Sequence, residues 1–161
     1  MPVQRRKKQA VVSFFLILLI LLFDQSTKLW VKDTLNIGES IPLIKNILHI
    51  TFVSNTGAAF GLFKQSTAIF IIISIVAVFI IGSIIIRSIL KRQFFDSIVF
   101  NLSLSLIFSG ALGNLIDRVK YGYVVDFIDV RIWPVFNISD ISITTGSFLL
   151  ILFYLRKSTS K

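Results

Sequence analysis

The chain contains no cysteine, and it has only one histidine and one methionine among its 161 residues. The absence of cysteine excludes disulfides, thiolate nucleophiles, iron–sulfur clusters and thiolate zinc sites. It also means that the chain is not itself a lipoprotein anchored through a cysteine. The single histidine, His49, has no second imidazole with which to complete a metal site, and we expect a surface or sheet-facing side chain there. We therefore predict neither a metal nor a cofactor.

Charged residues are scarce as well. They make up 16% of the chain, whereas hydrophobic residues make up 55% and the mean hydropathy is +0.85. Soluble domains average about 25% charged residues, so this composition indicates one integral membrane domain and excludes a disordered chain. The net charge of +9 is a feature of many nucleic-acid-binding proteins, but the distribution of the basic residues argues for another origin.

Four long apolar runs predict four transmembrane helices, at about 10–31, 67–87, 97–116 and 137–155. An α-helix needs roughly 20 apolar residues to cross the core of a bilayer, and each run is close to that length. The first run follows the basic sequence RRKK and resembles a secretory signal peptide, but no small-x-small cleavage site follows its apolar core. We therefore expect an uncleaved first membrane helix.

The basic residues are concentrated on one side of this four-helix arrangement, which the positive-inside rule makes the cytoplasmic side. Both termini are then expected in the cytoplasm, and both longer connections are expected outside. Acids and bases balance in the outward connections, so the basic pI is a signal of topology and no nucleic-acid partner is predicted. The cytoplasmic basic residues are Arg5, Arg6, Lys7, Lys8, Arg87, Lys91, Arg92, Arg156, Lys157 and Lys161.

The first outward connection, about 33–65, carries strand and turn signals. Its sequence ILHITFV (47–53) is rich in β-branched and aromatic residues and predicts a strand. The following NTGAAFG (55–61) contains two glycines and predicts a tight turn. The expected fold is thus an all-α membrane protein, a single domain over 1–161. It has four transmembrane helices, a small extracytoplasmic β element on the outer membrane surface, and both termini in the cytoplasm.

Two acids near the predicted outer interface are candidates for chemistry. Asp126 lies in the second outward connection and Asp140 at the start of the fourth helix. Taken alone, Asp140 is equally well explained as a helix cap, for which Asn137 and Ser139 are the other candidates. Two facing carboxylates, however, tend to share one proton. One then acts as base on a water while the other polarises a carbonyl, as in aspartic proteases.

The third helix ends in SGALGNLIDR, in which Gly110, Asn114 and Asp117 share one helix face. One interpretation is structural, with a polar seam between helices and an Asp117–Arg118 pair at the interface. The other is functional, with Asn114 and Arg118 orienting substrate carbonyls beside the two acids. The residues alone leave both open.

Five ordered motifs together closely resemble lipoprotein signal peptidase, also called signal peptidase II, an intramembrane aspartic peptidase family of bacteria. The resemblance covers nearly the whole chain. The motifs are DQSTK beginning at Asp24, NTGAAFG at Asn55, GALGNLIDR ending at Arg118, VVDFID around Asp126 and FNISD ending at Asp140.

The resemblance implies a role for each matching residue. Asp126 and Asp140 would be the catalytic dyad, while Asp129 would be a solvated or Arg131-paired acid outside it. The positions implied to line the site and hold substrate or inhibitor are Asn55, Asn114, Arg118 and Asn137. The positions implied to be structural are Asp24, Lys28, Gly57 and Asp117.

The resemblance also implies the substrate and the location. The substrate would be a prolipoprotein bearing a diacylglyceryl-modified cysteine, cleaved just before that cysteine. The enzyme would be a multi-pass protein of the bacterial cytoplasmic membrane, monomeric, surrounded by membrane lipids, with its active site at the extracytoplasmic face. Cyclic peptide inhibitors such as globomycin are expected to bind.

Two departures from the family pattern bear on the site. Ser139 stands where the family more often has alanine, and its hydroxyl is a candidate hydrogen-bond partner for a dyad carboxyl. The segment 126–140 is also shorter than in many relatives. The alternative function is a small proton-coupled transporter or channel subunit, which would place an acid near the bilayer midplane. An assembly or scaffold protein is a third class, and it gives no reason for five coincident motifs.

Overall fold

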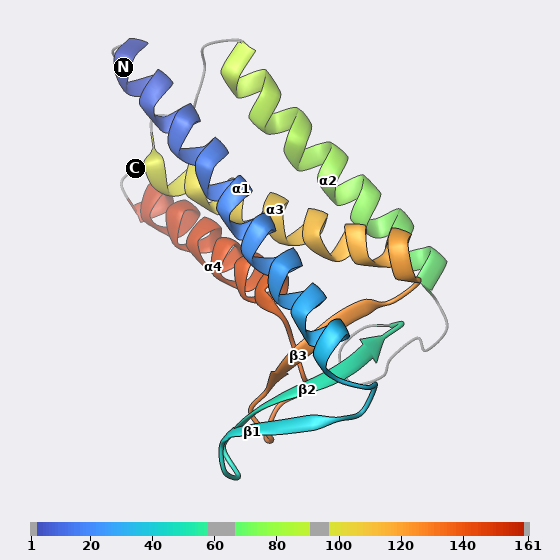
Figure 1. Cartoon of the computed structure of the whole chain (residues 1–161). Helices are drawn as coiled ribbons and strands as arrows, with labels where there is room; N and C mark the ends of the chain where they lie inside the picture. The colour runs from blue at the N-terminus through green and yellow to red at the C-terminus, as the bar shows by residue number, and fades with distance from the viewer. Residues whose placement is uncertain (1–2, 58–66, 91–96, 160–161) are drawn as a thin grey trace.

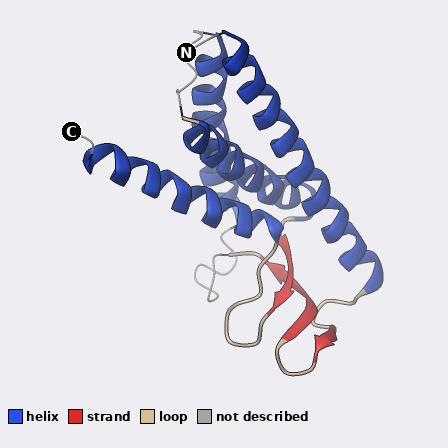
Figure 2. Ribbon diagram, turned by 90° about the vertical axis from the view of Figure 1, so that its left-hand side faces the viewer, coloured by secondary structure: helices blue, strands red, loops and turns tan. Residues whose placement is uncertain are grey.

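The computed structural model describes residues 3–57, 67–90 and 97–159. Long helices lie side by side and a small sheet lies at one end of them, while both chain ends lie away from the sheet (Figures 1 and 2). The helices are α1 (Val3–Thr34), α2 (Thr67–Leu90), α3 (Ile98–Tyr121) and α4 (Ile138–Thr159), and the strands are β1 (Ser40–Ile44), β2 (Leu48–Asn55) and β3 (Val124–Asp129).

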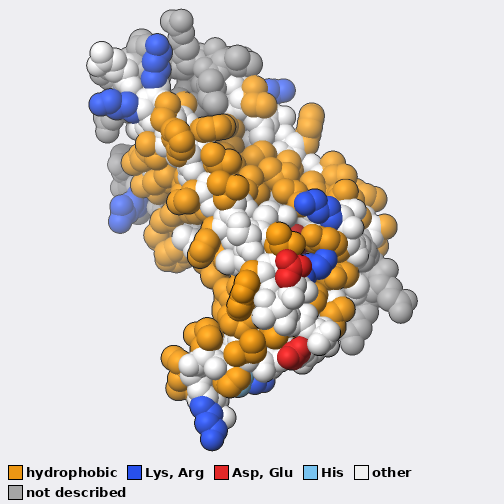
Figure 3. Space-filling model, in the orientation of Figure 1, with side chains coloured by type: hydrophobic (Ala, Val, Ile, Leu, Met, Phe, Trp, Pro, Cys, Tyr) orange, Lys and Arg blue, Asp and Glu red, His pale blue; other side chains and the backbone are white. Residues whose placement is uncertain are grey.

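All four helices are long and apolar enough to cross a membrane. Many of their large apolar side chains are exposed, as at Leu19, Phe79 and Phe148, and Figure 3 shows hydrophobic side chains covering much of the helical part. Such a surface is stable against lipid rather than water. The sequence-based expectation of a mainly helical protein with four membrane helices and a small β element is therefore confirmed.

Helix α3 is the central helix, since it packs against each of the other three. It runs past the predicted end at 116, through the charged residues Asp117 and Arg118, to Tyr121. The charge at Asp117 is tolerated because its side chain is buried against α1, where a lysine pairs with it. The helix ends at Gly122, whose φ of 78° is left-handed and whose N–H donates to the carbonyl oxygen of Arg118. Glycine is the usual residue at such a helix end.

The sheet combines strands from both outward connections. Its order is β1-β2-β3 with antiparallel pairing, and the register places Asp126 opposite Val53 and Asp129 opposite His49. The prediction of a β element confined to 33–65 was therefore incomplete, because β3 comes from the second connection. Val124, Val125, Asp126 and Phe127 are all buried, so β3 lacks the alternation that marks a half-exposed strand.

A compact apolar cluster attaches the sheet to the end of α1. It joins Val31 and Leu35 of α1 to Phe52, Val125 and Phe127 of the sheet. The cluster places β3, and hence Asp126, at the membrane-helix end of the sheet. Of the two positions expected for His49, at the surface or facing the sheet, the structure has the second, because its side chain is buried on β2.

Helices α3 and α4 approach each other closely through glycine. A Cβ added at Gly110 would overlap the carbonyl oxygen of Ser139 and crowd Ile143, both on α4. Small residues of this kind let membrane helices pack backbone to backbone. The contact fixes the start of α4, which carries Asp140, against α3.

We predict that Gly110→Ala lowers the stability of the protein, because the added methyl must push α4 away from α3. Overpacking of this kind costs about 1–3 kcal/mol, and thermal unfolding in detergent measures it. Gly82→Ala is the matched control, since its Cβ would meet only the edge of the Phe108 ring at 3.1 Å. Equal melting temperatures for the two variants would contradict this account of the α3–α4 contact.

Candidate active site

Asp126 and Asp140 come together at the sheet end of the helices, joined by one residue, Asn137. The Nδ2 of Asn137 donates to Oδ1 of Asp126 at 2.6 Å, and its backbone N–H donates to Oδ2 of Asp140 at 3.1 Å. Both acids line the same pocket, about 230 Å³ in volume. The structure thus brings the two predicted acids to one site.

The start of α4 shows why Asp140 is held so firmly. The Oδ1 of Asn137 accepts from the backbone N–H of Asp140 at 2.9 Å, while the carboxylate of Asp140 accepts from the backbone N–H of Asn137. This reciprocal pair is a capping box, which satisfies amide groups that the first turn of a helix leaves free. The cap and the pocket-lining position are therefore properties of the same carboxylate.

Asn55 holds the other oxygen of Asp126. Its Nδ2 donates to Oδ2 of Asp126 at 2.8 Å, and its own Oδ1 accepts from the backbone N–H of Gly57 at 3.0 Å. The turn after β2 thus fixes which way the Asn55 amide faces. Residues 58–61 of the NTGAAFG motif lie outside the described residues.

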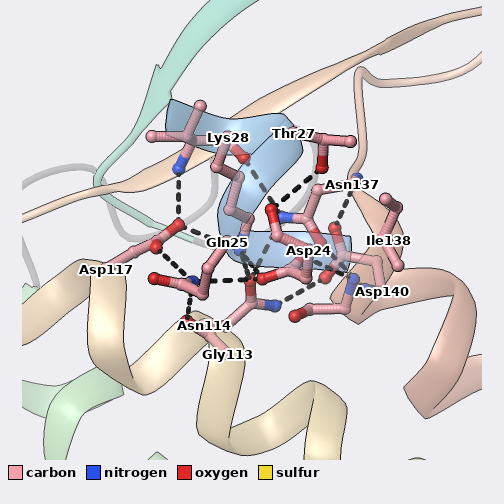
Figure 4. Close-up of polar contacts among 12 residues, drawn as sticks. Asp24, Gln25, Thr27, Lys28, Gly113, Asn114, Asp117, Asn137, Ile138 and Asp140 are labelled. Atoms are coloured by element: carbon pink, nitrogen blue, oxygen red, sulfur yellow. Dashed lines mark hydrogen bonds and ion pairs between the residues drawn. The ribbon is translucent and has the colours of Figure 1, made fainter. Parts of the chain in front are cut away.

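Asn114 of α3 connects Asp140 to a buried lysine (Figure 4). Its Nδ2 donates to Oδ1 of Asp140 at 2.8 Å. Its Oδ1 accepts from Nζ of Lys28 at 3.0 Å and from Nδ2 of Asn137 at 3.1 Å. An ammonium group only donates, so Lys28 forces the oxygen of the Asn114 amide toward itself and the nitrogen toward Asp140.

The ammonium group of Lys28 has three partners. Besides Asn114, its Nζ lies 2.9 Å from Oδ2 of Asp24 and 2.9 Å from Oδ2 of Asp117. All three charged side chains are buried, and such groups are stable only when paired and hydrogen-bonded. The expected Asp117–Arg118 pair is therefore replaced by a pair between Asp117 and Lys28.

The carboxylates beside Lys28 also hold the two elements that carry the candidate acids. Oδ1 of Asp24 accepts from the backbone N–H of Ser139 at 2.9 Å, at the start of α4. Oδ2 of Asp117 accepts from the backbone N–H of Val125 at 3.1 Å, next to Asp126 on β3. Gln25 adds bonds from its Nε2 to both carboxylates, a contact that the sequence motifs did not single out.

Arg118 contributes a cation to the wall of the pocket. Its guanidinium carbon lies 5.4 Å from the centre of the Phe70 ring, and both residues line the pocket with the two acids. Among the described residues, the buried Nε of Arg118 has no hydrogen-bond acceptor. A donor that is buried and unpaired is costly, and the charged group to which this nitrogen belongs lines the pocket beside the two acids.

Burial dominates the electrostatics of Asp126. Burial, followed by the negative charge of Asp140, raises the pKa of Asp126 to about 7. Hydrogen bonds from Asn55 and Asn137 act in the opposite direction but are outweighed. A pair of acids in this state retains a proton near neutral pH, which is the requirement for one acid and one base at a single site.

Ser139 differs from expectation, whereas Asp129 has the arginine partner that was expected for it. The hydroxyl of Ser139 is buried and faces Gly113 of α3, and within the described part of the chain it bonds to neither Asp126 nor Asp140. Asp129 pairs with Arg131 as predicted, at 3.4 Å, but its side chain is buried rather than solvated. Within residues 3–57, 67–90 and 97–159, no three His, Cys, Asp or Glu side chains group as a metal site would require.

Comparison with known proteins decides the family. The family model described as signal peptidase (SPase) II matches residues 16–156. The chain belongs to the signal peptidase II family. The match spans all five of the motifs from which that resemblance was drawn, so the sequence-based assignment is confirmed.

Individual relatives of this signal peptidase II chain agree. It is 46% identical over 134 residues to a lipoprotein signal peptidase of Halothermothrix orenii, covering 83% of this chain and 88% of that protein. It is 44% identical over 131 residues to a lipoprotein signal peptidase of Moorella thermoacetica, covering 81% and 84%. A bacterial membrane enzyme solved by the in meso method at 2.3 Å resolution matches with a TM-score of 0.83 and 36% identity, over 93% of this chain and 91% of that chain.

Proposed function

We propose that this member of the signal peptidase II family is a membrane-embedded aspartic endopeptidase that removes the signal peptide from prolipoproteins, with Asp126 and Asp140 as its catalytic dyad. The observation that carries the proposal is the bridge by Asn137, which holds both carboxylates on one pocket. The pKa of about 7 at Asp126 supports it, because a shared proton must persist at the pH of the cell surface.

The mechanism follows from one proton on two carboxyls. The ionised carboxylate accepts a proton from a water, and the water oxygen attacks the scissile carbonyl carbon. The protonated carboxyl donates to the carbonyl oxygen and stabilises the tetrahedral intermediate. Transfer of a proton to the departing amine then breaks the C–N bond, leaving a carboxylate and a free amino group.

The surrounding polar groups divide into two roles under this proposal. The amides of Asn55, Asn114 and Asn137 already donate to the dyad, so their main role is to orient the two carboxylates. Arg118, which lines the pocket beside the two acids, is the group that binds a substrate carbonyl. Asp24, Lys28 and Asp117 hold the dyad-bearing elements in place, and Gly57 fixes Asn55.

The implied substrate carries a diacylglyceryl-modified cysteine, and cleavage falls just before it. Both chain ends lie away from the sheet (Figure 1), and the distribution of basic residues favours cytoplasmic termini. We therefore place the dyad at the extracytoplasmic face of the bacterial cytoplasmic membrane. Exposed apolar residues of β1 and of the turn that follows it, Leu43, Ile44 and Ile47, would contact lipid there.

One chain supplies every group in this proposal, so a monomer is sufficient, and globomycin-type cyclic peptides would compete for the same pocket. A proton-coupled transporter is less well supported. Its acid would lie near the bilayer midplane, whereas Asp126 and Asp140 lie where the helices meet the sheet.

We predict that Asp126→Asn and Asp140→Asn each reduce processing of a lipid-modified prolipoprotein by at least about 10³-fold, since neither variant keeps a titratable pair. The assay follows the conversion of the prolipoprotein by purified enzyme in liposomes. Both variants should remain folded and membrane-inserted, and chelators should leave the wild-type rate unchanged because a carboxylate activates the water.

Two other acids provide the controls for this assay. Asp33→Asn changes an exposed carboxylate at the end of α1 and should process at the wild-type rate. Asp129→Asn should be far milder than either dyad variant. Normal turnover by Asp126→Asn or Asp140→Asn, or a complete loss in Asp129→Asn, would refute the assignment of the dyad.

We predict that activity falls as the pH rises above about 7, because the dyad then loses its shared proton. Asn55→Ala removes a donor that favours the ionised form of Asp126, so the pKa of Asp126 rises. The fall in activity on the alkaline side of the pH profile, which we call the alkaline limb, then moves to higher pH. The measurement is kcat/KM as a function of pH. Asn36→Ala, at an exposed asparagine, is the control, and a limb that stays in place or moves to lower pH in Asn55→Ala would contradict the prediction.

A further inference from the structure

The segment that follows β3 forms one wall of the pocket. Trp133, Pro134, Val135 and Phe136 all line it, and we refer to residues 133–136 as the pocket wall. The far end of the wall is fixed, since the backbone of Phe136 pairs with that of Ile128 at 2.8 and 3.1 Å. The position of the remaining wall therefore depends on how the chain leaves β3.

The chain leaves β3 through an unusual turn at Arg131. The N–H of Ile132 donates to the carbonyl oxygen of Val130 at 2.8 Å, and the φ of Arg131, between them, is 66°. A hydrogen bond across three residues with a positive central φ is a γ-turn of the rare, strained kind. Glycine would adopt it without strain, so an arginine here indicates that contacts of its side chain offset the strain.

The guanidinium of Arg131 reaches three residues of the sheet. One terminal nitrogen, Nη2, donates to Nδ1 of His49 at 2.6 Å and lies 3.4 Å from Oγ of Ser40. The other, Nη1, lies 3.4 Å from Oδ2 of Asp129, whose Oδ1 accepts from the backbone N–H of Arg131 at 2.9 Å. The turn is thus attached to β1, β2 and β3 together.

Counting protons gives each of these bonds a direction. A guanidinium only donates, so Nδ1 of His49 must present its lone pair and the ring proton must lie on Nε2. Thr51 donates to Asp129 at 2.7 Å, and it therefore accepts the proton of Ser40 at 2.8 Å. Arg131, Ser40, Thr51 and Asp129 form a closed ring of hydrogen bonds, with His49 as an additional acceptor. We call these five residues the Arg131 cluster.

The lowered pKa of Asp129 is consistent with this ring of hydrogen bonds. Burial acts to raise the pKa of Asp129, but the Thr51 hydroxyl, the backbone N–H of Arg131 and its guanidinium outweigh burial and lower it. The side chain of Arg131 is itself 43% exposed, and ion pairs of exposed arginines add little to stability. The contacts are therefore better explained by the geometry they impose than by the stability they add.

We propose that Arg131 is a positioning residue for peptide hydrolysis, which holds the pocket wall against the dyad by attaching the strained turn to the sheet. This inference rests on the proposed function only in taking the pocket as the place where the substrate binds. Arg131 contacts neither Asp126 nor Asp140 in any bond described above, so it acts through residues 133–136. Loss of its side chain should loosen the wall and weaken substrate binding.

The test uses Trp133 as a reporter of the wall. The chain has two tryptophans, so a Trp30→Phe parent leaves Trp133 as the only one. In this parent, Arg131→Gly removes the guanidinium and leaves a residue that adopts the positive φ of the turn without strain. His49→Leu removes the acceptor of the guanidinium and leaves the residues of the turn unchanged. His49→Asn is the matched control, because its Oδ1 replaces Nδ1 as an acceptor. Each variant is measured for acrylamide quenching of Trp133, melting temperature, and KM and kcat for the prolipoprotein.

We expect Arg131→Gly to raise KM about tenfold with a much smaller change in kcat, and to increase the quenching of Trp133. His49→Leu should also raise KM and increase the quenching of Trp133, and His49→Asn should stay close to the parent in both measurements. The melting temperature of Arg131→Gly should not fall, because the turn loses strain. If Arg131→Gly proves unstable, His49→Leu decides the question.

Unchanged quenching and unchanged KM in both Arg131→Gly and His49→Leu would overturn the inference, as would a loss of kcat alone. The quenching measurement needs no turnover, so it separates this inference from the proposed function. Active Asp126→Asn together with increased quenching in Arg131→Gly would refute the dyad and retain the role of Arg131. Inactive Asp126→Asn, together with unchanged quenching and unchanged KM in both Arg131→Gly and His49→Leu, would retain the dyad and refute the role of Arg131.

Discussion

The constraint on which the site depends is that two carboxylates must be buried beside each other where membrane helices end. Neither acid is stable there without donors, because a buried charge without partners costs several kcal/mol. Asn137 meets this requirement for both acids at once, with its side chain on Asp126 and its backbone on Asp140. Asn55 and Asn114 supply the remaining donors, so neutral amides stabilise the pair without cancelling the burial and the repulsion that raise the pKa of Asp126.

The buried lysine extends this arrangement into the helices. Lys28 fixes the orientation of the Asn114 amide, and Asp24 and Asp117 hold the backbone next to Asp140 and Asp126. Because the ammonium is shared between two carboxylates, it sets directions of hydrogen bonds without neutralising the dyad. The close glycine contact between α3 and α4 then keeps these partners within bonding distance. The hydrogen bonds at this site thus depend on the close packing of α3 against α4.

Much of this was predictable from the sequence, since long apolar runs and five motifs indicate four helices and the residues of the site. The strand β3 was missed, because VVDFID is buried on both faces and has no alternation. The pairing of Asp117 with Lys28 was also missed, because the two lie far apart in the chain and only the packing of α1 on α3 joins them. The contact between His49 and Arg131 was not predictable either, because it depends on a turn with a left-handed φ at Arg131, just after β3.

The central claim is that Asp126 and Asp140 hold one proton between them near neutral pH. Infrared difference spectroscopy of the enzyme in membranes tests it directly, because a protonated carboxyl has a carbonyl stretch that a carboxylate lacks. We expect a band that titrates near pH 7 and disappears in Asp126→Asn. In Asp140→Asn it should titrate at lower pH, because the charge of Asp140 no longer adds to the effect of burial on the pKa of Asp126. A spectrum with no protonated carboxyl between about pH 5 and 7, or a band that both substitutions leave unchanged, would contradict it.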